Sequence, residues 1–173
     1  MFSPADYAYM SHALRLAEKG LYSTAPNPRV GCVLVRNEQI VGSGWHEKAG
    51  QPHAEINALN NARAAARGAT AYVTLEPCGH FGRTPPCVSA LIAAGIANVI
   101  IAMEDPNPIV SGRGKALLEQ SGIAVQTGLL EAEARALNVG FITRMVDKKP
   151  WVRLKTAVSL DGKTALKNGV SQW

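Results

Sequence analysis

The sequence predicts an α/β domain whose sheet is covered by helices on both faces. Two apolar, β-branched segments on either side of residue 37 indicate a hairpin, and strand and helix patterns alternate from residue 53 onward. Alternating strands and helices typically place helices on both faces of one sheet. With 173 residues, 47% of them hydrophobic, the chain is long enough to bury a core of ordinary size.

The first predicted elements are a helix and a hairpin. The helix is expected to begin after Ser3 and to end before Gly20. Its core face is predicted from apolar residues at helical spacing, namely Tyr7, Met10, Leu14, Ala17 and Leu21. Residues 30–35 and 40–45 are expected to pair as antiparallel strands around a turn at 37–39.

Strands and helices are then expected to alternate. Residues 53–67 are rich in alanine and stop at Gly68, which predicts one helix. Thr84 is expected to cap a further helix, with prolines in its first turn, that continues to Ala94 and stops at Gly95. The other predicted elements are strands over 70–75, 98–102 and 124–127 and helices over 114–120 and 131–145.

A boundary is predicted near residues 147–150, and the charge changes close to it. Beyond the boundary, residues 151–157 predict a strand and residues 159–164 a turn. Residues 1–143 contain 11 basic and 11 acidic side chains, whereas residues 144–173 contain 7 basic and 2 acidic ones, so the last thirty residues account for the net charge of +5. A neutral body argues against a nucleic-acid partner, because such binding usually needs a clustered basic surface.

The same composition argues against a membrane or secreted protein. No stretch approaches the roughly 18 consecutive apolar residues that a spanning helix needs. The N-terminus shows no basic region followed by an apolar one, so no secretion signal is visible. Three cysteines without such a signal favour a reducing compartment over a disulfide framework. We therefore expect a cytoplasmic protein without a membrane partner.

His53, Glu55, Cys78 and Cys87 are the candidate catalytic centre. One imidazole and two thiolates are ligands that zinc prefers, and a catalytic site leaves the fourth position for water. Glu55 is expected to reach that water without binding the metal and to act as general acid and base. Zinc deaminases carry these residues in the order H-x-E followed by P-C-x-x-C. The order and Pro77 match here, but the cysteines are nine positions apart instead of three.

A closed structural zinc site is the main alternative. It would need a fourth protein ligand, for which His46 and His80 are candidates. This alternative leaves Glu55 without a role. Cys32 lies in an apolar strand pattern, and we expect it in the core and not at the metal.

Further side chains near the motif are candidates for substrate contact. Asn27 lies between two prolines, which either form a rigid turn or hold its amide against a heterocycle. His46 follows a predicted strand, where a substrate contact and a structural hydrogen bond both remain open. The insert at 79–86 is either a tolerated extension or a loop over the site; in the second case Arg83 could bind a phosphate or carbonyl, with His80 beside it.

On these residues, the chain resembles the bifunctional riboflavin-biosynthesis deaminase–reductases, in which the long cysteine spacing is normal. The matching stretches are 26–28, 30–33, 50 with 52–55, 72–78, 82–87, 105–108 and 112–114. The resemblance covers essentially the whole chain. It implies a cytidine-deaminase-like domain over residues 1–146, with three α/β/α layers and a mixed sheet. It also implies that residues 147–173 are a linker and the N-terminal fragment of a dihydrofolate-reductase-like domain.

The resemblance also implies a reaction. The family's zinc-dependent step converts 2,5-diamino-6-(5-phosphoribosylamino)pyrimidin-4(3H)-one to 5-amino-6-(5-phosphoribosylamino)uracil and ammonia. One Zn²⁺ per chain and a homo-oligomer are expected. The candidate substrate contacts are then Asn27, His46, His80, Arg83 and Asp105. A nucleoside, nucleotide or tRNA deaminase would share the zinc chemistry, but the neutral residues 1–143 and the long insert argue against it.

The last segment carries a second set of expectations from the resemblance. Ala157 and Trp173 match positions that contact NADP, and Ser171 matches one that contacts the reductase substrate. NADPH is therefore expected as the cofactor of the reductase domain. Most of that domain is absent from this chain, so we expect no reductase activity from it.

Overall fold

The computed structural model describes residues 1–79, 86–108 and 110–171. It shows a three-layer α/β/α domain built on one five-stranded sheet, as predicted. One face of the sheet is covered by α1 (Pro4–Glu18) and α5 (Glu131–Leu137). The other face is covered by α2 (Ala54–Ala62), α3 (Cys87–Ala94) and α4 (Arg113–Gln120).

The sheet is mixed and has the strand order β2-β1-β3-β4-β5. Strand β1 (Gly31–Arg36) is antiparallel to both β2 (Gln39–Trp45) and β3 (Thr70–Val73). Strand β3 is parallel to β4 (Asn98–Ile101), and β4 is parallel to β5 (Ala124–Thr127). The start of β1 and the ends of the other four strands therefore meet at one edge of the sheet, and the loops of that edge form the site.

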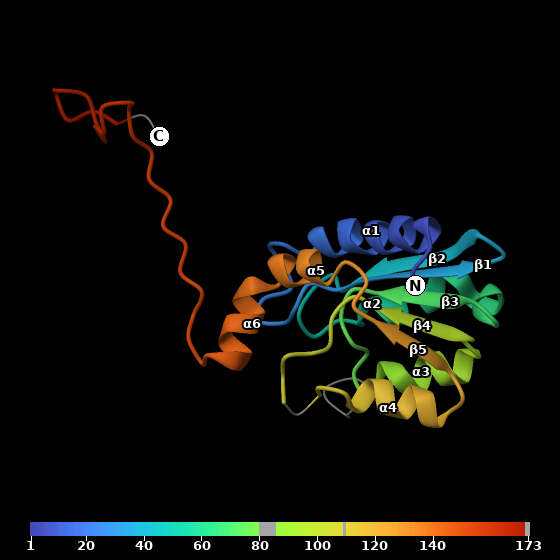
Figure 1. Ribbon diagram of the computed structural model, residues 1–173. Coiled ribbons are helices and arrows are strands. Elements are labelled where there is room, and N and C mark those ends of the chain that lie inside the picture. Colours follow the sequence, from blue (N-terminus) through green and yellow to red (C-terminus); the bar gives the residue numbers. More distant parts are fainter. Residues whose placement is uncertain (80–85, 109, 172–173) are drawn as a thin grey trace.

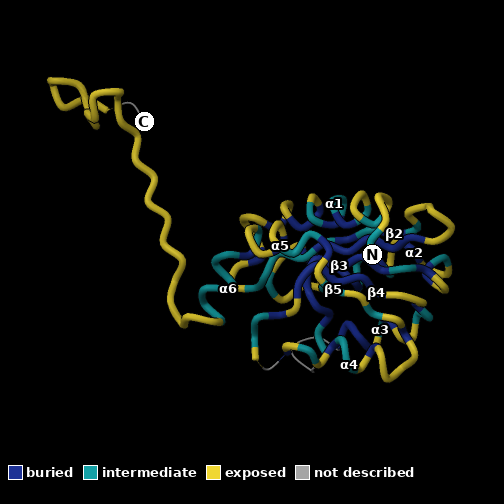
Figure 2. Tube along the Cα trace, in the orientation of Figure 1, coloured by how far each residue is buried: buried dark blue, intermediate teal, exposed yellow. Residues whose placement is uncertain are grey.

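Two cores lie on the two faces of the sheet, because side chains alternate along each strand. Cys32 and Leu34 of β1 pack toward α2, α3 and α4, whereas Val33 and Val35 pack toward α1. Figure 2 shows the buried residues concentrated in the sheet and in the helix faces turned toward it. Cys32 is fully buried in the core, as expected from the sequence.

Helix α2 lies unusually close to β2 because both surfaces are made of small residues. A Cβ atom at Gly44 would stand 2.5 Å from the backbone nitrogen of Ala58 and 2.7 Å from the carbonyl oxygen of Ala54. A Cβ atom at Gly42 would stand 2.5 Å from the carbonyl oxygen of Ala58. Any side chain at these glycines would push the helix away. The close approach sets the first turn of α2, with His53 as its N-cap, at the sheet edge.

Helix α1 begins as predicted, but part of its expected core face is wrong. Ser3 is the N-cap, and its hydroxyl and the Asp6 carboxylate form a reciprocal capping box. Met10 and Ala17 are buried as expected, whereas Tyr7 and Leu21 are about half exposed (47% and 49%). The buried face also includes Ala13 and Leu16. The helix lies close to β1 at Gly31, where a Cβ atom would stand 1.9 Å from the Ala13 carbonyl oxygen.

Two predicted helices are interrupted. The helix expected over 53–67 ends at Ala62 and continues as a 3-10 turn, η1 (Arg63–Ala66). The helix expected over 131–145 divides at Asn138 into α5 and α6 (Val139–Val146). Asn138 leaves the helical conformation, with φ −111° and ψ 21°, and its side chain bonds the backbone of a distant segment.

The other boundaries differ by small amounts. Strands β3 and β4 end two residues and one residue earlier than predicted, at Val73 and Ile101. Helix α3 begins at Cys87 with Pro86 as N-cap, so Pro86 precedes the first turn. Thr84, the expected cap, lies outside the described residues.

The strand predicted over residues 151–157 does not form. These residues are exposed and extended, and they leave the domain after α6 (Figure 1). The predicted turn does form, because the Gly162 amide donates to the Ser159 carbonyl over 2.9 Å. Among the described residues, no helix is long and apolar enough to cross a membrane.

Candidate active site

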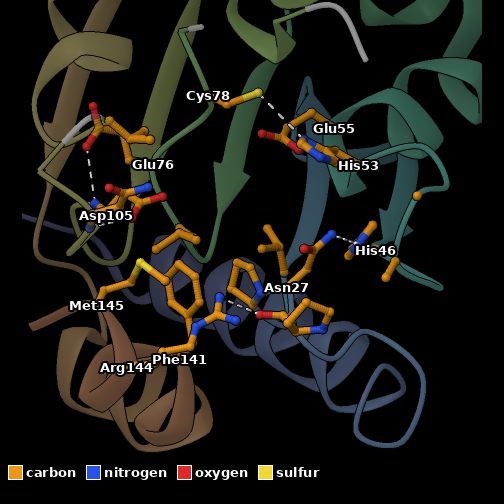
Figure 3. A pocket seen from close by; sticks show the side chains of 18 of the residues that line it. Asn27, His46, His53, Glu55, Glu76, Cys78, Asp105, Phe141, Arg144 and Met145 are labelled. Carbon is orange, nitrogen blue, oxygen red and sulfur yellow. Dashed lines mark hydrogen bonds between the residues drawn. The ribbon is translucent and has the colours of Figure 1, made fainter. Parts of the chain in front are cut away.

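The candidate site is a cavity of about 450 Å³ at the edge where the strands end. Its walls come from the loop before β1, the first turn of α2, the loops after β2, β3 and β4, and the end of α6. Figure 3 shows the His53, Glu55 and Cys78 side chains at one end of the cavity and Arg144 at the other. Segments that are far apart in the sequence therefore share one enclosed space.

The three predicted metal ligands converge. The Nδ1 atom of His53 lies 3.2 Å from the Cys87 sulfur and 3.6 Å from the Cys78 sulfur. All three candidate ligand atoms lie within 4.8 Å of one another. His53 is the N-cap of α2, Cys87 is the first residue of α3 and Cys78 lies on the loop after β3. One nitrogen and two sulfurs at this spacing fit a zinc ion.

The environment of the two cysteines favours a thiolate. The pKa of Cys78 is lowered to about 4, first by a hydrogen bond from Cys87 and then by one from His53. The Cys87 amide also donates to the Cys78 sulfur over 3.3 Å, as expected at a helix N-terminus. The pKa of Cys87 is raised, because its thiol bonds to Cys78 and is buried. Metal binding requires both thiols to lose their protons.

Glu55 lies beside this group in the first turn of α2 and is 3% exposed. Burial raises the pKa of its carboxyl group to about 7, and the neighbouring Cys78 adds to the rise. A carboxyl group in this environment gains and loses a proton near neutral pH. That property suits a general acid and base.

His46 and Asn27 form a hydrogen-bonded pair in the cavity wall. The Nδ1 atom of His46 lies 3.1 Å from the Pro52 carbonyl oxygen, which can only accept, so Nδ1 carries the proton. The Nε2 atom of His46 then accepts from the Asn27 amide over 3.1 Å (Figure 3). Burial lowers the pKa of His46. Because both ring nitrogens are engaged, His46 does not serve as a fourth metal ligand in this arrangement, and its structural hydrogen bond is confirmed.

Glu76 is a cavity residue to which the sequence assigned no role. Its buried carboxylate accepts hydrogen bonds from four backbone amides, of Asp105, Gly112, Gly114 and Lys115, at 2.9–3.2 Å. The signal in the sequence was a carboxylate placed directly after a buried strand and before Pro77. Its partners, 29–39 residues away, could not be identified from that pattern.

Asp105, one of the predicted substrate contacts, lies in the cavity wall on the loop after β4. Its side chain is 8% exposed, and its Oδ1 atom accepts from the Asn107 amide over 2.8 Å. Asn107 also lines the cavity. The structure therefore places Asp105 where a bound molecule could reach it.

Arg144 is the second residue that the sequence analysis missed. It is the one lysine or arginine among the described residues that line the cavity. One guanidinium nitrogen donates to the Pro26 carbonyl over 2.8 Å, and the group lies 5.8 Å from the Phe141 ring (Figure 3). Its Nε atom is buried and has no hydrogen-bond partner in the part of the chain that the structure describes. Only its position in the basic last turn of a helix was visible in the sequence.

The remaining predicted site residues are not brought to the cavity by the described structure. His80, Arg83 and Trp173 lie outside the described residues. Ala157 and Ser171 are exposed on the extended segment that follows α6, and neither lines the cavity. The roles assigned to these five residues stay predictions.

The family model for the cytidine and deoxycytidylate deaminase zinc-binding region matches residues 3–103, a stretch that contains all four candidate catalytic residues. The chain belongs to this zinc-binding deaminase family. The matched region includes β1 to β4 and both helices that present ligands. It also confirms the predicted cytidine-deaminase-like fold.

Curated relatives give a narrower likeness. Riboflavin biosynthesis protein RibD of Escherichia coli (strain K12) is 56% identical over 168 residues, which are 97% of this chain and 46% of the relative. Diaminohydroxyphosphoribosylamino-pyrimidine deaminase of Buchnera aphidicola subsp. Schizaphis graminum is 56% identical over 140 residues, 81% of this deaminase chain and 95% of the relative. The chain thus spans about half the length of the RibD relatives but nearly the full length of the shorter protein.

Solved structures agree. Acinetobacter baumannii RibD, form 1, superposes with a TM-score of 0.91 at 54% identity and covers 98% of this chain and 48% of its own. Aspergillus oryzae Rib2 deaminase, solved in complex with DARIPP, superposes with a TM-score of 0.64 at 28% identity. The match covers 82% of this chain and 93% of the Rib2 chain. The resemblance to riboflavin-biosynthesis deaminases, expected from the motifs, is confirmed.

Proposed function

We propose that this chain catalyses the deaminase step of riboflavin biosynthesis. In this step the 2-amino group of 2,5-diamino-6-(5-phosphoribosylamino)pyrimidin-4(3H)-one is hydrolysed to give 5-amino-6-(5-phosphoribosylamino)uracil and ammonia. The observation that carries the proposal is the buried Glu55 carboxyl group beside the converging His53, Cys78 and Cys87 atoms. The relative that this chain covers almost completely is named for deamination of this class of compound.

Each side chain has a role in the proposed reaction. Bound by His53, Cys78 and Cys87, zinc would supply a Lewis acid that makes water nucleophilic near neutral pH. Glu55 takes a proton from the attacking water and delivers it to the pyrimidine ring nitrogen. It then takes the proton of the new hydroxyl group on the tetrahedral carbon and delivers it to the amine, so that the carbonyl forms, the C–N bond breaks and ammonia leaves. A positioned acid–base group of this kind typically contributes about 10²–10⁴-fold in rate.

The opposite end of the cavity suits the phosphoribosyl part of the substrate. Arg144 presents a guanidinium group there, and guanidinium binds phosphate through several parallel donors. Between the two ends, the amides of Asn27 and Asn107 and the carboxylate of Asp105 offer donors and acceptors for the heterocycle. On this proposal His80 and Arg83, which lie outside the described residues, keep their predicted role as further substrate contacts.

The longer relatives define what this proposal leaves out. On this proposal the reductase step and its NADPH belong to the part of the longer relatives that this chain does not match; one solved relative, from Thermotoga maritima, is named as both a deaminase and a uracil reductase. Ala157, Ser171 and Trp173 would serve that part. We also propose a domain boundary near residue 147. We further propose that the chain forms a homo-oligomer, which the mass of the purified chain in solution tests.

Ammonia release from the phosphoribosyl diaminopyrimidine is the test, with cytidine and deoxycytidine monophosphate alongside. We expect turnover of the phosphoribosyl diaminopyrimidine alone. The Glu55→Gln variant should keep its zinc, and its kcat should be lower by at least ~10²-fold. Glu119→Gln, an exposed replacement on α4, is the matched control and should retain full activity.

Activity on the cytosine compounds alone would contradict the proposed substrate. Ammonia release by Glu55→Gln at the wild-type rate would contradict the assigned role of Glu55. No activity from a zinc-loaded chain on any of the three compounds would contradict the proposal as a whole.

A further inference from the structure

The Glu76 carboxylate connects three segments of the cavity wall. It projects from the loop after β3, two residues before Cys78, and accepts amides from two other segments. Its Oε2 atom accepts from Asp105 on the loop after β4 at 3.2 Å and from Gly112 at 3.0 Å. Its Oε1 atom accepts from Gly114 at 2.9 Å and from Lys115 at 3.2 Å. All four bonds are charge-assisted, and such bonds are roughly twice as strong as neutral ones.

The carboxylate also replaces the missing cap of helix α4. The N-cap of this helix is Gly112, which has no side chain to accept a hydrogen bond. Gly114 and Lys115 belong to the first turn, where amides are left without partners inside the helix. Glu76 accepts both amides at the positive end of the helix dipole. The helix start is therefore held by a residue that lies 36 to 39 positions earlier in the chain.

A glycine at position 114 allows the first turn of α4 to lie close to the Glu76 loop. A Cβ atom at Gly114 would stand 1.9 Å from the Pro77 carbonyl oxygen, so the first turn of α4 lies directly against the loop that carries Glu76. The Glu76 amide donates to the Met103 carbonyl over 3.0 Å, which ties the loops after β3 and β4 together a second time. Glu76 and Asp105 both line the cavity, and Figure 3 shows them next to each other.

We propose that Glu76 is a positioning residue for deamination, which holds the Asp105–Asn107 wall of the cavity at the distance from the His53–Cys78–Cys87 group that the substrate requires. The inference rests on the proposed function. It assigns Glu76 no contact with the reacting atoms. Because its effect passes through the loop after β4, loss of the carboxylate should act on substrate binding and alignment and should leave the metal in place.

A double-mutant cycle tests this route. The four proteins are the wild type, Glu76→Gln, Asp105→Asn and the double variant, with kcat and KM measured on the phosphoribosyl diaminopyrimidine at matched zinc content. Glu76→Gln replaces one acceptor oxygen by a donor that faces amides, and misalignment of this size costs about 10- to 100-fold in kcat/KM. If Glu76 acts through Asp105, the double variant loses no more than the worse single variant, since groups that act as one unit are not additive. Glu104→Gln, an exposed neighbour of Asp105, is the control and should match the wild type.

The outcomes separate this inference from the proposed function. Wild-type inactivity on the substrate would refute the proposed function and this inference with it. If the wild type is active, full additivity of the kcat/KM losses of Glu76→Gln and Asp105→Asn would overturn the positioning role. Loss of zinc from Glu76→Gln would also overturn it, because the substitution would then act on the metal ligand Cys78. If Glu76→Gln fails to fold, the cycle is run with Glu76→Asp, whose shorter carboxylate keeps the charge and should give a smaller, still non-additive loss.

Discussion

At the scale of single residues, two buried glutamates in one cavity behave differently because their surroundings differ. Glu76 is surrounded by four backbone amides that bond its carboxylate. Glu55 is buried next to Cys78, and this burial raises the pKa of its carboxyl group to about 7. The four bonds fix the position of the Glu76 side chain, whereas the surroundings of Glu55 favour a group that exchanges a proton near neutral pH. The assignment of Glu55 to chemistry and Glu76 to positioning follows from this contrast.

The raised pKa of Glu55 predicts a pH-dependent stability. In the unfolded chain this carboxyl group ionises near its ordinary pKa of 4.5, but in the folded domain it keeps its proton until about pH 7. The folded state binds more protons between these values, so the stability that Glu55 contributes is lost as the pH rises through about 7. Replacement by glutamine removes this loss. Without zinc, Glu55→Gln should therefore gain roughly 2 to 3 kcal/mol in free energy of unfolding, relative to wild type, on going from pH 5 to pH 8.

Urea unfolding of both proteins in EDTA at the two pH values measures this difference. A constant offset between wild type and variant at pH 5 and pH 8 would show that Glu55 ionises normally in the folded domain. The comparison cancels the titration of groups that do not interact with Glu55, since these groups behave alike in both proteins.

At the scale of elements, the junction between α5 and α6 determines how the far end of the cavity is built. Asn138 is 2% exposed, accepts from the Arg29 amide at 2.8 Å and donates to the Arg29 carbonyl at 2.9 Å. The Asn138 side chain thus bonds both backbone groups of Arg29, as a residue of a neighbouring strand would, in the segment just before β1. It interrupts the helix and turns α6 so that Phe141 and Arg144 reach the cavity. The interruption therefore has a tertiary cause.

Asn138→Ala is expected to destabilise the domain by about 2 to 4 kcal/mol, because it removes a buried side chain together with its two bonds to the half-buried Arg29 amide and carbonyl. Asn98→Ala is the control, since its side chain makes an exposed bond to Thr70 and should cost less than about 1 kcal/mol. The measurement is the denaturant midpoint of each variant at equal zinc content. Equal losses for the two variants would mean that the Arg29 pairing is not a principal support of this junction.

At the scale of the whole molecule, the sheet topology assembles the site. The start of β1 and the ends of β2, β3 and β4 lie at one edge, so Asn27, His46, Cys78 and Asp105 become neighbours although 78 positions separate the first from the last. The N-termini of α2 and α3 bring His53 and Cys87 to the same edge. A bound metal would join the starts of two helices to a strand loop and would therefore stabilise the fold as well as the chemistry.

Cys87→Ser is expected to reduce bound zinc from one per chain to near zero and to lower Tm by several degrees, because metal binding to the native state alone stabilises it. Cys32→Ala is the matched control. Cys32 is fully buried in the core away from the ligand group, so this variant should lose some stability but keep its zinc. Elemental analysis after dialysis, together with thermal unfolding, measures both quantities. Full zinc content in Cys87→Ser would remove Cys87 from the ligand set.

The sequence by itself determined the fold class and most element positions, and it predicted the candidate catalytic group. Local patterns predict these features: apolar residues alternate along strands, capping residues mark helix starts, and His53 and Glu55 lie two residues apart. The structure confirms that the His53, Cys78 and Cys87 atoms converge, as the motif predicted. Local patterns predict well here because helix and strand periodicity is a property of neighbouring residues.

Only the tertiary structure decided how buried polar groups are satisfied. The partners of Glu76, Asn138 and Arg144 lie between 29 and 118 positions away, and no local pattern identifies them. The same reason explains the missing strand at residues 151–157, whose composition suits a strand but whose backbone has no neighbouring strand to bond among the described residues. A strand and a buried carboxylate both need partners, and which residues become partners is settled when the chain folds.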